Sequence, residues 1–181
     1  MGVVLQDWRT ELTAVLPHFF ASGAGDAAPA RAVCTIECGP GWADVVDRLC
    51  VRIAATLQDR ERFRFASIRQ REGALRIVWG GRLSSASEAV VREAVDLAEA
   101  RSVCVCEVCG GRGRLYRADG IRTTRCPVHA SGDRAVRPEL ENVHLRTAGG
   151  RLRVVVGCRY DFGTDSFVDV DDDRPAGRLE V

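Results

Sequence analysis

The chain has 181 residues, 46% of them hydrophobic, and a formal net charge of +1, which predicts one globular core with a small appendage. No stretch approaches the ~20 apolar residues that a membrane span needs. Asp7, Arg9 and Glu11 interrupt the apolar stripe near the N-terminus, so no signal-peptide core is present. We therefore expect a cytoplasmic protein, in a reducing compartment where structural disulfides are rare.

The first third of the chain alternates helical and extended patterns. Apolar residues recur at helical spacing within residues 3–20, which predicts a first helix. Residues 21–30 are small and include glycine and proline, so we expect a linker there. Residues 33–38 predict a short strand, which ends at the Gly-Pro-Gly sequence of residues 39–41. A helix with one apolar face is expected to follow over residues 42–57.

A hairpin is expected next. Residues 62–68 carry Phe63 and Phe65 on one side, and residues 75–79 continue the same alternation of apolar and polar side chains after Gly73. This period of two is typical of strands with one buried face, and glycine marks the turn between them. The pattern therefore predicts an antiparallel pair of strands.

A second long helix leads into a basic, cysteine-rich segment. Ser84 or Ser85 can cap a helix that runs to about Arg101, and Ser85 with Glu88 has the spacing of a capping box. All of the basic residues in the chain are arginine, and residues 101–137 hold eight arginines against three acidic residues. This local excess of positive charge is interpreted either as an ordinary solvated surface or as a binding surface.

The strongest chemical signal lies in this segment. It reads Cys106-Glu-Val-Cys109, then sixteen residues, then Cys126-Pro-Val-His129. Two close-set pairs of thiol and imidazole ligands at this spacing are typical of a tetrahedral zinc site. Gly110 and Gly111 follow the first pair and can adopt the positive φ that such a turn often needs. We therefore predict Zn as the cofactor.

The same four residues are also compatible with arrangements that hold no metal. They could be unrelated core cysteines with a surface histidine, or disulfide-bonded, although a reducing compartment disfavours disulfides. A thioredoxin-like redox pair is disfavoured because the first pair is matched by a second one. Four protein ligands fill a zinc shell and leave no position for water, so the metal is expected to be structural rather than catalytic.

The chain turns to strand patterns after the cysteine segment. A polar connector is expected over residues 131–138. Alternating apolar residues around Gly149-Gly150 predict a second hairpin, with strands near 143–145 and 152–156. A third strand is expected at residues 166–170. The four aspartates within residues 169–173 predict an exposed acidic turn, because the glycine and distal glutamate of an EF-hand loop are missing.

Several short motifs together resemble a group of small, largely uncharacterised proteins of bacteria and their phages. The resemblance covers about residues 34–130. The motifs that carry it are Glu37-Cys-Gly-Pro-Gly-Trp42, Asp47-Arg-Leu-Cys50, Ile68–Ile77, Cys106-Glu-Val-Cys-Gly110, Gly113-Arg114 and Thr124-Arg-Cys-Pro-Val-His129. The resemblance implies a strand, helix, hairpin, helix and zinc-knuckle order, with Cys106, Cys109, Cys126 and His129 as ligands, and it implies no activity. Cys104 departs from the group's pattern and is an alternative thiolate ligand.

One catalytic hypothesis rests on the turn at residues 38–42. Cys38 would stand close to a helix N-terminus, an environment that lowers a thiol pKa and creates a nucleophile. No histidine base is near it in the sequence. The competing interpretation is that the Gly-Pro-Gly sequence ends the strand and starts the helix, with Trp42 as a core anchor. Cys38 is kept as the single candidate catalytic residue of an alternative, thiol-dependent enzyme.

These observations predict an α+β fold, with a short antiparallel sheet, two to three helices, a zinc knuckle and a β-rich C-terminal extension. The expected parts are an N-terminal helix and linker (1–31), the zinc-knuckle domain (32–130) and a β-hairpin extension (131–181). We expect a non-enzymatic binding module that contacts a protein or nucleic acid, with no membrane or small-molecule partner. The expected contacts are Arg112, Arg114, Arg117, Arg122 and Arg125. In a further alternative, the C-terminal hairpin carries the interaction by edge-strand pairing.

Overall fold

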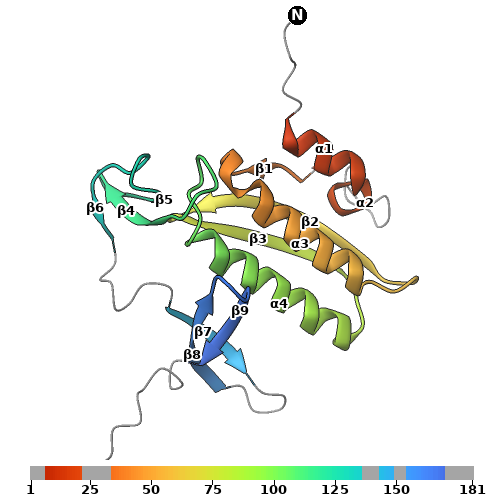
Figure 1. The fold of residues 1–181 in the computed structure, drawn as a ribbon. Coiled ribbons are helices and arrows are strands. Elements are labelled where there is room, and N and C mark those ends of the chain that lie inside the picture. The colour runs from red at the N-terminus through yellow and green to blue at the C-terminus, as the bar shows by residue number, and fades with distance from the viewer. Residues whose placement is uncertain (1–6, 22–33, 136–142, 149–153, 170–181) are drawn as a thin grey trace, which may run out of the picture.

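A computed structural model describes residues 7–21, 34–135, 143–148 and 154–169 of the chain. Within these ranges the fold is α+β, as predicted (Figure 1). The linker predicted at residues 21–30, the Gly149-Gly150 turn and the acidic run after Asp169 lie almost wholly outside the described residues. The helices are α1 (Trp8–Val15), α2 (Pro17–Phe20), α3 (Ala43–Thr56), α4 (Ser85–Ser102) and the short 3-10 helix η1 (Pro40–Trp42).

The central sheet has the order β1-β2-β3. Its strands are β1 (Ile36–Glu37), β2 (Arg62–Arg71) and β3 (Ala74–Arg82). The predicted hairpin is confirmed: β2 and β3 pair antiparallel, and the turn residues Glu72 and Gly73 both have positive φ, 54° and 78°, as a tight two-residue hairpin turn requires. β1 pairs parallel to β2, so the sheet is mixed rather than wholly antiparallel.

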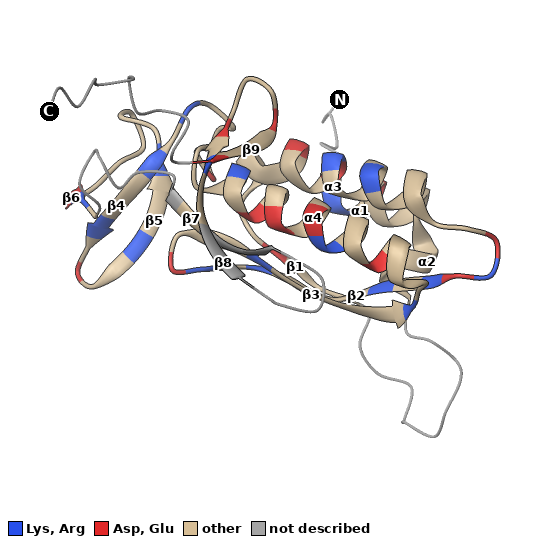
Figure 2. Ribbon diagram, turned by 90° about the horizontal axis from the view of Figure 1, so that it is seen from below, with Lys and Arg blue, Asp and Glu red and all other residues tan. Residues whose placement is uncertain are grey.

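One face of this sheet is covered by helices. The register of β2 against β3 shifts between Phe65 and Ser67, and this bulge changes which residues point inward. Phe63 and Phe65 before the bulge and Ile68 after it are therefore all buried. Seen along the layers, α1 to α4 lie on one side of β1–β3 (Figure 2).

The main core lies between the sheet and the helices. Trp42, Leu49 and Ile53 are fully buried on the α3 side. The N-terminal helices join the same core, because the ring of Phe19 packs edge-on against Phe63 at 5.1 Å between centroids. Removing apolar surface of this extent from water is the main source of stability in a domain of this size.

Two helix ends differ from the predictions. The single helix predicted over residues 3–20 is wrong: the chain forms α1 and α2, broken at Leu16, because Pro17 has no N–H to continue the hydrogen-bond ladder. The N-cap of α4 is Ser84, whose side chain accepts a hydrogen bond from the Ser87 N–H. Of the two predicted caps, Ser84 is therefore the N-cap, and the capping box predicted for Ser85 and Glu88 does not form, because the Ser84 N–H donates to Glu61 at 2.8 Å.

The C-terminal sheet has the order β7-β8-β9, with strands β7 (Val143–Ala148), β8 (Val154–Asp161) and β9 (Ser166–Asp169). It confirms the predicted hairpin and third strand. The sheet is joined to the helices by a polar network: the Tyr160 hydroxyl donates to Asp165 and accepts from Arg101 on α4 at 3.1 Å, and Arg52 on α3 pairs with Asp165 at 2.6 Å. Among the described residues, no helix is both long enough and apolar enough to cross a bilayer.

Candidate metal centre

The structure brings the four predicted residues together. The ligand atoms of Cys106, Cys109, Cys126 and His129 all lie within 4.8 Å of one another. The Sγ atoms of Cys109 and Cys126 are 3.8 Å apart, and His129 Nδ1 is 3.2 Å from Cys126 Sγ and 3.7 Å from Cys106 Sγ. Cys104 is not a member of this group; it packs beside Leu97, Ala100 and Tyr160.

The spacing of the four donors fits a tetrahedral ion. Zn–S bonds of ~2.3 Å and Zn–N bonds of ~2.0–2.1 Å give tetrahedron edges of about 3.8 Å between sulfurs and about 3.6 Å between sulfur and nitrogen. Three of the donor separations, 3.8, 3.7 and 3.2 Å, are close to these edges, and all of them lie within 4.8 Å. A set of three thiols and one imidazole is also one that zinc prefers. The set is complete, so a bound metal would have no protein-free position for a substrate.

The first ligand turn prepares its thiol for a metal. Burial opposes ionisation of Cys106, but backbone N–H groups of Cys126, Cys109 and Val108 point at its sulfur and together lower its pKa to about 6. Metal ligation requires the thiolate. Gly110 closes this turn with a φ of 75° and donates its N–H to the Cys106 carbonyl at 2.9 Å, so the predicted need for glycine holds at this position.

The Gly39–Trp42 turn packs directly against this ligand turn and is hydrogen-bonded to it. The Gly41 N–H donates to the Glu107 carbonyl at 2.8 Å, and the buried Trp42 Nε1 donates to the Val105 carbonyl, also at 2.8 Å. A Cβ atom at Gly41 would lie 2.1 Å from the Cys106 carbonyl oxygen. Glycine is needed here because two backbones meet without room for a side chain.

Glu107 joins the two motifs by its side chain, a role that the sequence pattern did not indicate. One carboxylate oxygen accepts the Gly39 N–H at 3.0 Å, and the other pairs with Arg125 at 2.8 Å. The side chain is largely buried, with 11% exposed. A carboxylate in such a position is stable because each oxygen has a partner. The only indication of this role in the sequence was that Glu107 lies between two predicted ligand cysteines.

The segment between the ligand pairs is a hairpin that was not predicted. It consists of β4 (Arg114–Ala118) and β5 (Ile121–Arg125), and β6 (Asp133–Arg134) pairs with β4. Asp119 and Gly120 form the turn with φ of 49° and 79°. Asp-Gly between alternating residues is a strong hairpin signal, and it was present in the sequence.

This hairpin is anchored to the β2–β3 turn of the central sheet. The Thr124 hydroxyl donates to the Gly73 carbonyl at 2.6 Å and is fully buried. The Gln70 side-chain amide donates to the Arg122 carbonyl at 3.1 Å. The metal-ligand segment is thus held to the domain at two places, the Gly39–Trp42 turn and the β2–β3 turn.

The five predicted contact arginines do not form one surface. The strand register pairs Arg117 with Arg122 and Arg114 with Arg125, and side chains alternate along a strand, so the two pairs lie on opposite faces of the hairpin. Arg125 forms an ion pair with Glu107. Arg112 lies over the Phe162 ring at 4.1 Å from its centroid. Arg117 and Arg122 are exposed.

Cys38 lies in a setting unlike that of a nucleophile. Its side chain is buried, and burial raises the pKa of its thiol to about 12, although the Arg9 charge partly opposes this. The thiol therefore stays protonated at neutral pH, whereas a nucleophilic cysteine needs a lowered pKa. The turn that follows Cys38 is packed against the metal-ligand segment, with Gly39 and Gly41 both hydrogen-bonded to Glu107.

Comparisons with known proteins give no relative from which a role could be transferred. No protein-family model matches the chain, and no curated protein and no solved structure is significantly similar to it. The functional conclusions below therefore depend on the geometry of this chain alone.

Proposed function

We propose that the chain is a zinc-stabilised, non-enzymatic binding module that contacts a macromolecule, either a protein or a nucleic acid. The observation that carries the proposal is the complete set of Cys106, Cys109, Cys126 and His129 donors, seated on the Gly39–Trp42 turn. A complete tetrahedral set supports a structural rather than a catalytic metal. In this role zinc contributes free energy to folding, and the exposed Arg117 and Arg122 on the same hairpin are the contacts offered to the partner.

The thiol-enzyme alternative gains no support from the raised pKa of Cys38. The alternative in which the C-terminal hairpin carries the interaction by edge-strand pairing would use β7 or β9, the outer strands of that sheet. We further propose membership of the bacterial and phage group that the motifs resemble. The contact between the Glu37–Trp42 motif and the Cys106–Gly110 motif supports it, because each needs the other for its backbone geometry.

The test is to measure metal and binding together. Purified chain should contain about one equivalent of zinc, and a strong chelator should unfold the knuckle. Captured partners from a native lysate should be lost after chelation, and also after replacing Arg117 and Arg122 with glutamine. A chain that folds fully without metal, or whose partners persist in both treatments, would refute the proposal.

A further inference from the structure

The side of the central sheet that faces away from the helices carries a concentration of arginine. Outward-pointing positions of β2 and β3 hold six of them, defined here as the arginine face: Arg62, Arg64, Arg69, Arg71, Arg76 and Arg82. All six are exposed. At ~3.3 Å per residue, β2 extends this face over about 30 Å. None of these residues was among the predicted contacts.

This face holds more positive charge than its neighbours neutralise. Arg62 is directly opposite Arg82 and Arg69 is opposite Arg76, and like charges in such cross-strand pairs are destabilising. Arg76 pairs with Glu99 at 2.8 Å. Within the described part of the chain, no ion pair forms at four of the others: Arg64, Arg69, Arg71 and Arg82.

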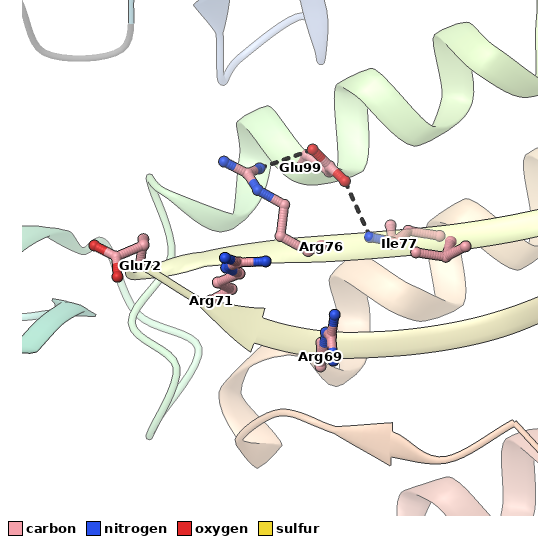
Figure 3. Close-up of a pocket in the computed structure, with 7 residues that line it drawn as sticks. Arg69, Arg71, Glu72, Arg76, Ile77 and Glu99 are labelled. Carbon is pink, nitrogen blue, oxygen red and sulfur yellow. Dashed lines mark hydrogen bonds and ion pairs between the residues drawn. The ribbon is translucent and has the colours of Figure 1, made fainter.

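A shallow hollow of about 420 Å³ lies at the end of the face nearest the zinc hairpin. Arg69, Arg71 and Arg76 line it, and Glu99 reaches from α4 to hold Arg76 and the Ile77 N–H (Figure 3). Glu99 thus fixes one guanidinium and accepts one N–H at the edge of β3. The remaining guanidinium groups are available for an anion at this end, and Arg62, Arg64 and Arg82 are available at the opposite end.

The chemistry of the face selects a particular polyanion. Charge repeated over about 30 Å fits a ligand with many anionic groups rather than a single small anion. Single-stranded nucleic acid is bound by aromatic stacking, but Trp79 points to the core side, where its ring stacks on Phe63. Duplex RNA is recognised by its A-form shape and by 2′-hydroxyl contacts as well as through its phosphates. The outward side chains of these two strands, apart from Ser67, are either guanidinium groups suited to phosphates or small apolar groups.

We propose that the arginine face binds the phosphate backbone of duplex DNA without reading its sequence. This inference rests on the proposed binding function and names its partner, but it places the main contact on the central sheet rather than on the zinc hairpin. Guanidinium groups pair with phosphate oxygens by two parallel hydrogen bonds. No base-specific contact is required, so affinity depends on charge and on salt.

The test is fluorescence anisotropy of a labelled 30-base-pair DNA duplex with the full, zinc-loaded chain. Five phosphate contacts predict that binding weakens about 500-fold between 50 and 200 mM salt. Replacing Arg64 and Arg69 with glutamine should weaken binding at 50 mM salt and reduce that salt effect to about 40-fold. The matched control replaces Arg48 and Arg92, two exposed arginines on the helical side, and should bind like the wild type. Zinc content and circular dichroism establish that all variants are folded.

The outcomes separate this inference from the proposed function. If the Arg64 and Arg69 variant binds DNA as the control does, the inference is wrong. If binding is lost only on replacing Arg117 and Arg122, the proposed zinc-hairpin contact stands and the arginine face does not. A polyglutamate peptide or an RNA duplex that binds more tightly than the DNA would also overturn the assignment to duplex DNA.

Discussion

Replacing Gly41 with alanine tests the contact between the two motifs most directly. The new Cβ would lie 2.1 Å from the Cys106 carbonyl oxygen, 2.5 Å from the Gly110 nitrogen and 2.8 Å from the Cys109 nitrogen. Ordinary contact distances are ~3.5 Å or more, so the ligand turn would have to retreat by about 1 Å. All three neighbours are backbone atoms, and no side-chain rotation can relieve the overlap.

The expected cost of this change is large. Overpacking of a well-packed site costs about 1–3 kcal/mol. The retreat would also break the hydrogen bonds from Gly41 to Glu107 and from Trp42 to Val105, each worth about 0.5–1.5 kcal/mol. We expect a loss of about 3–5 kcal/mol in the free energy of unfolding, a large part of a typical stability of ~5–15 kcal/mol.

Urea unfolding followed by tryptophan fluorescence measures the stability, and competition with a chromophoric chelator measures zinc affinity. If the contact between the two turns and metal binding are coupled, zinc affinity should fall by about 100- to 3,000-fold, because ~1.4 kcal/mol corresponds to a factor of ten. The matched control is Gly80→Ala, where a Cβ meets no atom within 4 Å; this variant should be neutral or stabilised by about 0.5 kcal/mol. A Gly41→Ala protein that matches this control in both assays would refute the proposed coupling between the Gly39–Trp42 turn and the metal-ligand turn.

Three further predictions concern polar contacts. Glu107→Gln keeps the shape of the side chain but leaves Arg125, whose side chain is 20% exposed, without its charged partner. Urea unfolding should show a loss of about 1–3 kcal/mol, the cost of a largely buried group that loses its partner. The control Glu88→Gln, in the exposed pair with Arg92, should lose less than about 0.5 kcal/mol. Tyr160→Phe removes the hydroxyl between Arg101 and Asp165 and should cost about 1–2 kcal/mol; an unchanged midpoint would exclude this network as the link to the C-terminal sheet. The N–H groups of Ser84 and Gln58 lower the pKa of Glu61 to about 2, so its stabilising effect is present above the unfolded pKa of ~4.3 and is lost as pH falls toward 2. The difference in melting temperature between wild type and Glu61→Gln should therefore shrink from pH 5 to pH 3, and a constant difference would contradict the assignment.

Local patterns were sufficient to predict most of the elements. The period of two around Gly73 and the helical stripe before Leu57 depend on neighbouring residues only, and both agree with the structure. The ligand pairs also follow from spacing, since one tight turn sets the distance between each pair of donors. Two of the missed features are of the same local kind, because the Pro17 break and the Asp119-Gly120 turn both have clear signals in the sequence.

Periodicity and ligand spacing were enough to predict the α+β class and a four-ligand metal site, with Cys104 left as an alternative ligand. The fold shows that Gly41 and Glu107 join the turn after Cys38 to the metal-ligand segment. No local pattern could show this, because residues about 65 positions apart meet only after the chain has folded. It also separated the arginines of the zinc hairpin onto two faces and gathered those of β2 and β3 onto one. Strand register and the bulge after Phe65 set these directions, and neither can be determined from composition or local charge.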